Sequence, residues 1–192
     1  CSNPPYGYVK DPTDKKKWIV DEEAAEIVKR IFDLCIAGKG PLQIAKILTA
    51  DKVLTVTAYN ARQKGWAMPD NLYQWCAKSV AGILERQEYT GCTVNFKTYT
   101  KSLKFKKRME NPKENQRVFE DTQPAIIERG QWERVQTLRA NKRRPTKTGK
   151  TSIFSGLVYC ADCGAKLYYC TCNTYKDESQ DHFVCSNYKS NT

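Results

Sequence analysis

Apolar residues recur at helical spacing through the first half of the chain. From residue 24 to residue 35 they fall three or four positions apart, directly after Asp21, Glu22 and Glu23, which suit the N-terminus of a helix. Glycines at 38 and 40 end this predicted helix, and Pro41 begins a second one. The pattern that follows Trp75 predicts a third helix over residues 76–86. Three short helices with a glycine turn are typical of helix-turn-helix DNA readers, and also of ordinary small bundles.

The second half mixes strand and helix patterns. Residues 93–99 alternate between polar and apolar, as a half-buried strand does, and residues 116–121 predict its antiparallel partner. A helix is predicted over residues 128–141, with Trp132, Val135 and Leu138 facing inward. Farther on, residues 153–159 and 166–169 predict the two strands of a small hairpin.

Weakly periodic segments separate these elements. Residues 1–17 are interpreted as an extended arm before a short strand at 18–20, and residues 55–74 as mostly loop. We therefore predict an α+β fold with a helical, helix-turn-helix-like unit, a β-hairpin and a following helix over residues 1–141. A basic linker is expected at 142–151, and a small β zinc-ribbon domain at 152–192, truncated because the chain stops inside it.

The distribution of charge along the chain indicates more about function than the overall composition does. With 40% hydrophobic and 28% charged residues, the 192-residue chain fits a globular protein, and no apolar run is long enough for a membrane span. The net charge is +11, and residues 97–150 alone hold 16 Lys and Arg against six Asp and Glu, a net of +10. This concentration predicts a surface for a polyanion, most often nucleic acid, although a solvated basic loop would look the same.

Cysteine spacing predicts a metal site near the C-terminus. Cys160 and Cys163, followed by Gly164, have the spacing of a zinc knuckle, and 21 residues separate Cys163 from Cys185. A hairpin this small has too little core to fold alone, so bound zinc would stabilise it. The odd total of nine cysteines favours a reducing compartment, the cytosol or the nucleoid.

The fourth ligand stays open in the sequence. His182 lies three residues before Cys185, but positions three apart on a strand face opposite ways. Cys170 and Cys172 are eligible as a Cys-x-Cys pair; otherwise water or a neighbouring molecule fills the position, or the site is empty. The remaining cysteines are interpreted as buried small hydrophobes: Cys35, Cys76 and Cys92.

Several short motifs occur in the order found in a known family. They are Pro5-Tyr6-Gly7-Tyr8, Val20-Asp21-Glu22-Glu23-Ala24, Ile27-Val28-Lys29-Arg30-Ile31-Phe32, Gly38-x-Gly40, Ile44-Ala45-x-x-Leu48, Trp75, Val80, Ile83-Leu84, Tyr89-Thr90-Gly91, Pro124-Ala125-Ile126-Ile127, Trp132-Glu133-x-Val135-Gln136 and Ser155-Gly156-Leu157-Val158-Tyr159-Cys160-x-x-Cys163-Gly164. Together they resemble the recombinase domain and the start of the zinc ribbon of large serine recombinases, which include phage integrases and resolvase-like enzymes of mobile elements. The family's ribbon normally has a second cysteine after the one that matches Cys185, and this chain has none.

The resemblance implies a role without catalysis for this part of the protein. In the family the nucleophilic serine belongs to an N-terminal resolvase-type domain, which is expected before Cys1. Neither clustered arginines nor a base that would activate a serine is found near the serines here, so none is assigned that role: Ser2, Ser79, Ser102, Ser152 and Ser155. The full-length protein is expected to be a dimer or tetramer on DNA, and this chain alone a monomer.

The expected partner is double-stranded DNA, read at the attachment-site or element-end half-sites of a mobile element. The third helix would enter a major groove with its open face: Lys78, Ser79, Glu85 and Arg86. The loop of the hairpin would follow phosphates with its cations: Lys101, Lys104, Lys106, Lys107 and Arg108. The linker would contribute Lys142, Arg143 and Arg144 at the minor groove or the backbone.

Two other functions fit parts of the sequence. A zinc-ribbon RNA-binding protein would share the charge, but RNA readers usually display stacking aromatics on an open sheet, and Phe96, Tyr99 and Phe105 are few and scattered. A metal-dependent hydrolase would need an open zinc site with a general base such as Glu178 or Asp181.

Overall fold

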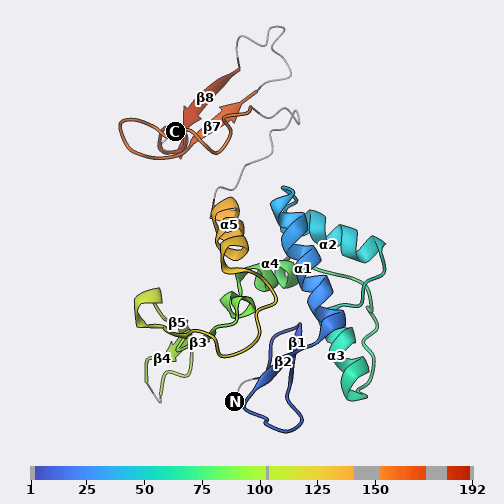
Figure 1. Cartoon of the computed structure of the whole chain (residues 1–192). Helices are drawn as coiled ribbons and strands as arrows, with labels where there is room; N and C mark the ends of the chain where they lie inside the picture. The colour runs from blue at the N-terminus through green and yellow to red at the C-terminus, as the bar shows by residue number, and fades with distance from the viewer. Residues whose placement is uncertain (1–2, 103, 141–151, 172–180, 191–192) are drawn as a thin grey trace. The chain divides into compact units, whose positions relative to one another are not determined.

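A computed structural model describes residues 3–102, 104–140, 152–171 and 181–190 of the chain (Figure 1). The architecture is α+β, as predicted, with five α-helices longer than two turns and four two-stranded antiparallel sheets in the described residues. The chain divides into two compact units, residues 1–136 and 137–192, which are described separately below. Within the described residues, no helix is long and apolar enough to cross a membrane.

Three helices form the centre of the first unit. They are α1 (Glu22–Ile36), α2 (Pro41–Ala50) and α4 (Ala77–Glu85), and each packs against the other two. The predicted apolar stripe of α1 is buried, with Val28, Ile31 and Phe32 fully inaccessible. Burial of such a stripe is the main source of stability for helices this short. The helix-turn-helix-like unit predicted from the periodicity is therefore present.

A helix that the sequence did not predict lies inside the segment 55–74. Helix α3 (Val56–Lys64) begins at Thr55, whose hydroxyl accepts a hydrogen bond from the Ala58 N–H at 3.3 Å, and it ends at Gly65 in the left-handed conformation (φ 65°). It buries only two alanines and Tyr59. The prediction of a loop was wrong because so narrow an apolar face has almost no periodic signal, whereas both caps are present in the sequence.

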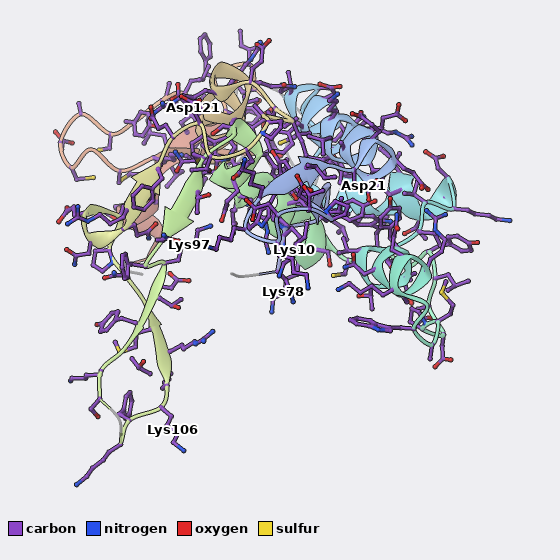
Figure 2. All side chains as sticks on the ribbon, turned by 60° about the horizontal axis from the view of Figure 1, so that its bottom comes forward. Lys10, Asp21, Lys78, Lys97, Lys106 and Asp121 are labelled. Carbon is purple, nitrogen blue, oxygen red and sulfur yellow. The ribbon has the colours of Figure 1, made fainter. Side chains whose placement is uncertain are left out.

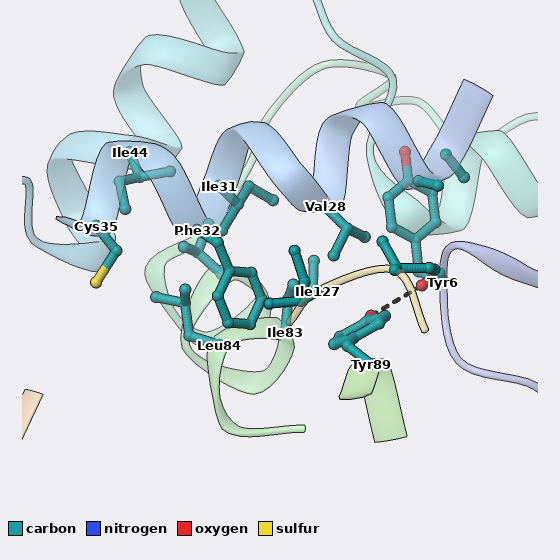
Figure 3. Packing of buried hydrophobic residues seen from close by; sticks show 14 of the residues in the cluster. Tyr6, Val28, Ile31, Phe32, Cys35, Ile44, Ile83, Leu84, Tyr89 and Ile127 are labelled. Carbon is teal, nitrogen blue, oxygen red and sulfur yellow. Dashed lines mark hydrogen bonds between the residues drawn. The ribbon is translucent and has the colours of Figure 1, made fainter. Parts of the chain in front are cut away.

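The core is centred on Tyr89, in the 3-10 helix η1 (Gln87–Thr90) (Figure 3). Its ring is fully buried, and its hydroxyl donates a 2.8 Å hydrogen bond to the Tyr6 carbonyl. The Tyr89 ring also stacks on Tyr8 and meets Phe32 edge-on. Tyr8 begins strand β1 (Tyr8–Lys10), which pairs with β2 (Trp18–Val20). Residues 6–10 are therefore part of the core and its small sheet, and not of an extended arm.

Two hairpins follow the helices. Strand β3 (Thr93–Asn95) pairs with β6 (Arg117–Phe119), and β4 (Thr98–Thr100) pairs with β5 (Arg108–Glu110); a 3-10 turn, η2 (Lys113–Asn115), precedes β6. The predicted partner of residues 93–99 is confirmed, but the single strand is broken at Phe96, which has a φ of 60°. This left-handed residue separates the two ladders, so β4 belongs to a second hairpin.

Helix α5 (Arg129–Ala140) is the last element before residues 141–151. Val135 is fully buried, and Trp132 packs partly buried against the core, as predicted. Leu138 is 44% exposed, so its predicted inward orientation was wrong. The Gln136 side chain donates to the Leu84 carbonyl at 2.7 Å and fixes the end of α4.

The second unit contains a small hairpin. Strand β7 (Leu167–Cys170) pairs with β8 (His182–Cys185), and a short helix, α6 (Ser186–Ser190), follows. Residues 166–169 are thus largely a strand, as predicted, but its partner is β8. The strand predicted at 153–159 was wrong: the segment forms turns, and only Tyr159 makes an isolated bridge, to Lys166. Its apolar run predicted burial, yet Ile153 is 79% exposed.

Candidate nucleic-acid interface and metal centre

Helix α4 is fixed against α2 by the tryptophan that precedes it. The Trp75 side chain is buried, and its ring N–H donates to the Val53 carbonyl at 3.0 Å. Its backbone N–H donates to the Thr49 hydroxyl at 3.1 Å. Val80, Ile83 and Leu84 then bury the inner face of α4. These contacts hold the start and the orientation of the helix.

The outer side of α4 is exposed and polar. The predicted groove residues all lie there: Lys78, Ser79, Glu85 and Arg86. Cys76 is also exposed, which corrects its interpretation as a buried hydrophobe; Cys35 and Cys92 are buried. The Cys76 sulfur caps α4 by accepting the Ser79 N–H at 3.4 Å. Hydrogen bonds from the Ser79 side chain and backbone lower the pKa of the Cys76 thiol.

The β4–β5 hairpin, residues 98–110, is here called the basic arm. Figure 2 shows it projecting from the rest of the first unit, with Lys106 near its far end and well apart from Lys78. All the described residues of the arm are exposed, including every predicted phosphate-contacting cation: Lys101, Lys104, Lys106, Lys107 and Arg108. The structure thus presents two separate sets of exposed cations on one unit, Lys78 and Arg86 at α4 and the cations of the arm. The linker residues Lys142, Arg143 and Arg144 lie outside the described residues.

An ion pair with one buried partner holds the base of the arm. The Lys97 ammonium pairs with the Glu88 carboxylate, whose side chain is 10% exposed. Asn111 adds two hydrogen bonds, from its backbone N–H to the Lys97 carbonyl and from its side chain to the Phe96 carbonyl, both 2.9 Å. The other Glu88 oxygen is buried without a hydrogen-bond partner among the described residues. Sequence reasoning missed this pair, since a glutamate in a polar 3-10 turn gives no sign of burial.

The knuckle in the second unit has the geometry of a thiolate metal site. The Gly164 N–H donates to the Cys160 carbonyl at 2.9 Å, and Gly164 adopts a φ of 67°, which forms the tight turn. The sulfurs of Cys160, Cys163 and Cys185 all lie within 4.8 Å of one another, and those of Cys163 and Cys185 are 3.5 Å apart. Tetrahedral zinc with bonds of about 2.3 Å separates its sulfur ligands by about 3.8 Å. The three predicted cysteines therefore fit zinc.

Comparison with known families agrees with both units. A family model described as Recombinase matches residues 22–142, and one described as Recombinase zinc beta ribbon domain matches residues 153–192. The first match alone covers more than half of the chain. The chain belongs to the large serine recombinase family.

A solved structure shares the fold of this chain. A crystal structure of an LSR–DNA complex matches all of this recombinase chain at 16% identity, with a TM-score of 0.51, over 54% of the other chain. A structure from work on the sequence requirements of the Listeria innocua prophage attP site matches at 17% identity, with a TM-score of 0.42, over 68% of that chain. The chain thus spans about half the length of the first of these relatives.

Three cysteines of the described residues lie close enough together to ligate one metal ion. Backbone N–H groups of Tyr188 and Asn187, in the first turn of α6, lower the pKa of the Cys185 thiol and so favour the thiolate that binds metal. His182 is not part of the cluster: side chains alternate along a strand, so it faces away from Cys185. Cys170 pairs with His182 across the ladder and shares its face. Cys172 lies outside the described residues.

Three of the serines considered in the sequence make local contacts in the structure. The Ser79 hydroxyl contacts the Cys76 sulfur at 3.1 Å, the Ser102 hydroxyl accepts from the Phe105 N–H, and the Ser152 hydroxyl accepts from the Phe154 N–H. None of these contacts is with a base that would remove the serine proton. Asp181, a possible base for a hydrolase, instead accepts a 2.9 Å hydrogen bond from Tyr169; Glu178 lies outside the described residues.

Proposed function

We propose that this chain is the DNA-binding portion of a site-specific serine recombinase of a mobile element. In this proposal it recognises the half-sites of attachment sites or element ends, where strand exchange integrates or excises the element. Strand cleavage is assigned to a catalytic serine domain outside these residues. The observation that carries the proposal is the match to the recombinase family over a unit that exposes a basic arm. The LSR–DNA complex with the same fold supports it.

The two sets of exposed cations suggest two different kinds of contact with DNA. Helix α4, held by Trp75, enters a major groove with Lys78, Ser79 and Arg86, because a helix of this kind fits the groove and its side chains reach base edges. The basic arm contacts phosphates, which positions the protein on the duplex without reading sequence. The linker cations at 142–144 follow the minor groove or the backbone between the two units.

The zinc ribbon adds a second module. Zinc held by Cys160, Cys163 and Cys185 would fold a hairpin that has almost no core of its own. Joining two DNA-binding modules by a linker raises affinity through effective concentration, which suits a long half-site. We assign the ribbon to the outer part of that half-site and expect the full-length protein to work as a dimer or tetramer in the bacterial cytoplasm.

The arm tests the proposal through salt dependence. Lys106→Ala combined with Lys107→Ala removes two exposed cations, so the slope of log affinity against log salt should fall by about 2, at about 0.9 for each phosphate contact. All duplexes should lose affinity about equally. The matched control is Lys29→Ala with Lys46→Ala, which removes the same charge from exposed positions on α1 and α2. An unchanged slope in the arm variant, or an equal change in the control, would remove the arm from the interface.

RNA binding is a second candidate function, and one observation favours it. Four aromatic side chains on the two hairpins are exposed, among them Phe96 (64%) and Tyr99 (43%), and exposed aromatics stack on unpaired bases. These residues sit on two-stranded ribbons and not on the four-stranded open sheet of the common RNA-binding module. Direct competition between single-stranded RNA and duplex DNA separates the two functions.

A further inference from the structure

The basic arm carries apolar side chains that it does not bury. Tyr99 and Met109 lie directly opposite each other in the β4–β5 ladder, so they share one face of the ribbon, and they are 43% and 38% exposed. Phe105, in the connecting turn, is 49% exposed. An isolated two-stranded ribbon is only marginally stable in water. These side chains are therefore not there to build a core.

Phe105 has a defined place at the end of the arm. Its backbone N–H donates to the Ser102 hydroxyl at 3.0 Å, which closes the turn locally. Exposed cations lie on both sides of it in sequence, Lys104 before and Lys106 and Lys107 after. A large apolar ring is thus presented between positive charges, next in sequence to Lys106, which Figure 2 shows near the far end of the arm.

We infer that Phe105 is an apolar wedge that enters the minor groove of duplex DNA and partly unstacks one base step. This inference rests on the proposed function and goes beyond it, because it assigns the arm a role in DNA deformation as well as phosphate contact. The ring cannot donate or accept a hydrogen bond, so its gain on a duplex comes from stacking and not from reading base edges. Side chains of this class insert between base steps from the minor groove and kink the duplex.

The flanking lysines suit this placement. The minor groove is about 6 Å wide, so cations on either side of an inserted ring lie close to the phosphates of both strands. Lys104 and Lys106 would neutralise those phosphates while the ring opens the step. The base of the arm, held by the Lys97–Glu88 pair and by Asn111, would transmit the position of α4 to the wedge. Flexible pyrimidine–purine steps are the expected insertion sites, because they kink most easily.

The test uses this chain and a short duplex that it selects from a randomised library. The duplex carries 2-aminopurine at its pyrimidine–purine steps and a donor–acceptor dye pair at its ends. At saturating protein, wild type should raise the 2-aminopurine fluorescence and bring the dyes closer. Phe105→Ala should remove both signals from the fully bound complex and weaken affinity about five- to a hundredfold, the range for one lost base–aromatic stack. Phe105→Leu, which keeps an apolar wedge, should restore most of both signals.

Controls separate this inference from the proposed function. Phe119→Ala removes an equally exposed ring from β6 and should leave both signals unchanged. If Phe105→Ala gives the wild-type signals at saturation, or wild type binds without any signal, the wedge is refuted while DNA binding stands. If wild type prefers no duplex to any other polymer, the proposed function fails as well. Phe105-dependent binding to vesicles of anionic lipid, with no signal from the duplex, would also overturn the wedge.

Discussion

The ion pair at the base of the basic arm allows a quantitative test of how the arm is held. Lys97→Met removes the ion-pair partner of the Glu88 carboxylate and leaves that charge in a site where the Glu88 side chain is 10% exposed. Breaking a fully buried pair in this way costs about 3–5 kcal/mol, and an exposed pair about 0–1 kcal/mol. Because the Lys97 side chain is 43% exposed, we expect an intermediate loss of about 2 kcal/mol in the free energy of unfolding.

A double-mutant cycle isolates the pair. Glu88→Gln should cost about 1 kcal/mol alone, since it keeps a polar group but loses the charge, and combined with Lys97→Met it should be less destabilising than the sum of the two. Urea denaturation measures each free energy, and the expected coupling is about 1–2 kcal/mol. The exposed Arg62–Glu23 pair is the control and should show much weaker coupling. Additive effects within about 0.5 kcal/mol would refute the reasoning that burial makes this pair strong.

Three further predictions concern the core, a turn and the metal. Tyr89→Phe should lower the free energy of unfolding by about 1–2 kcal/mol, because it leaves the buried Tyr6 carbonyl without its donor; thermal unfolding measures this, and no change would contradict it. Gly91→Ala should cost about 2 kcal/mol or more, because φ is +89° and the new Cβ would lie 2.9 Å from the Gln123 carbonyl oxygen. Gly82→Ala in α4, where the Cβ meets nothing, is its control and should stabilise. Chelation of zinc should make residues 153–190 sensitive to trypsin and leave the helical circular dichroism nearly intact; protection in chelator would argue against a structural metal.

Helices were predictable where burial is periodic. Helices α1, α2 and α4 each bury a regular stripe, and the sequence placed all three within a residue or two. Helix α3 was missed because it buries little besides alanine, although Thr55 and Gly65 are ordinary cap residues. Local caps, given more weight than periodicity, would have found it.

The strands were predicted less well because pairing is decided by distant contacts. The alternation at 93–99 is real, but the left-handed Phe96 that divides it follows from the hydrogen bonds of Asn111, far along the chain. The apolar run at 153–159 reads as a strand only if it is buried, and it is exposed. No local pattern distinguishes these cases.

The residues of the candidate site also differ in whether the sequence could predict them. The cysteine ligands were predictable, because the spacing of Cys160 and Cys163 reflects the local geometry of a knuckle. The cations of the arm were predictable from charge density. The role of Cys76 as a helix cap and the Glu88–Lys97 pair were not, because both depend on which atoms tertiary packing leaves near each other.

The most direct test of the central claim is equilibrium competition for this chain among three polymers at several salt concentrations. They are duplex DNA from the ends of the element that encodes it, random duplex DNA, and single-stranded RNA of equal length. A sequence-reading DNA-binding module should prefer the element-end duplex by about a thousandfold or more, with a salt slope that indicates several phosphate contacts. Equal affinity for the two duplexes, or a preference for the single-stranded RNA, would contradict the account.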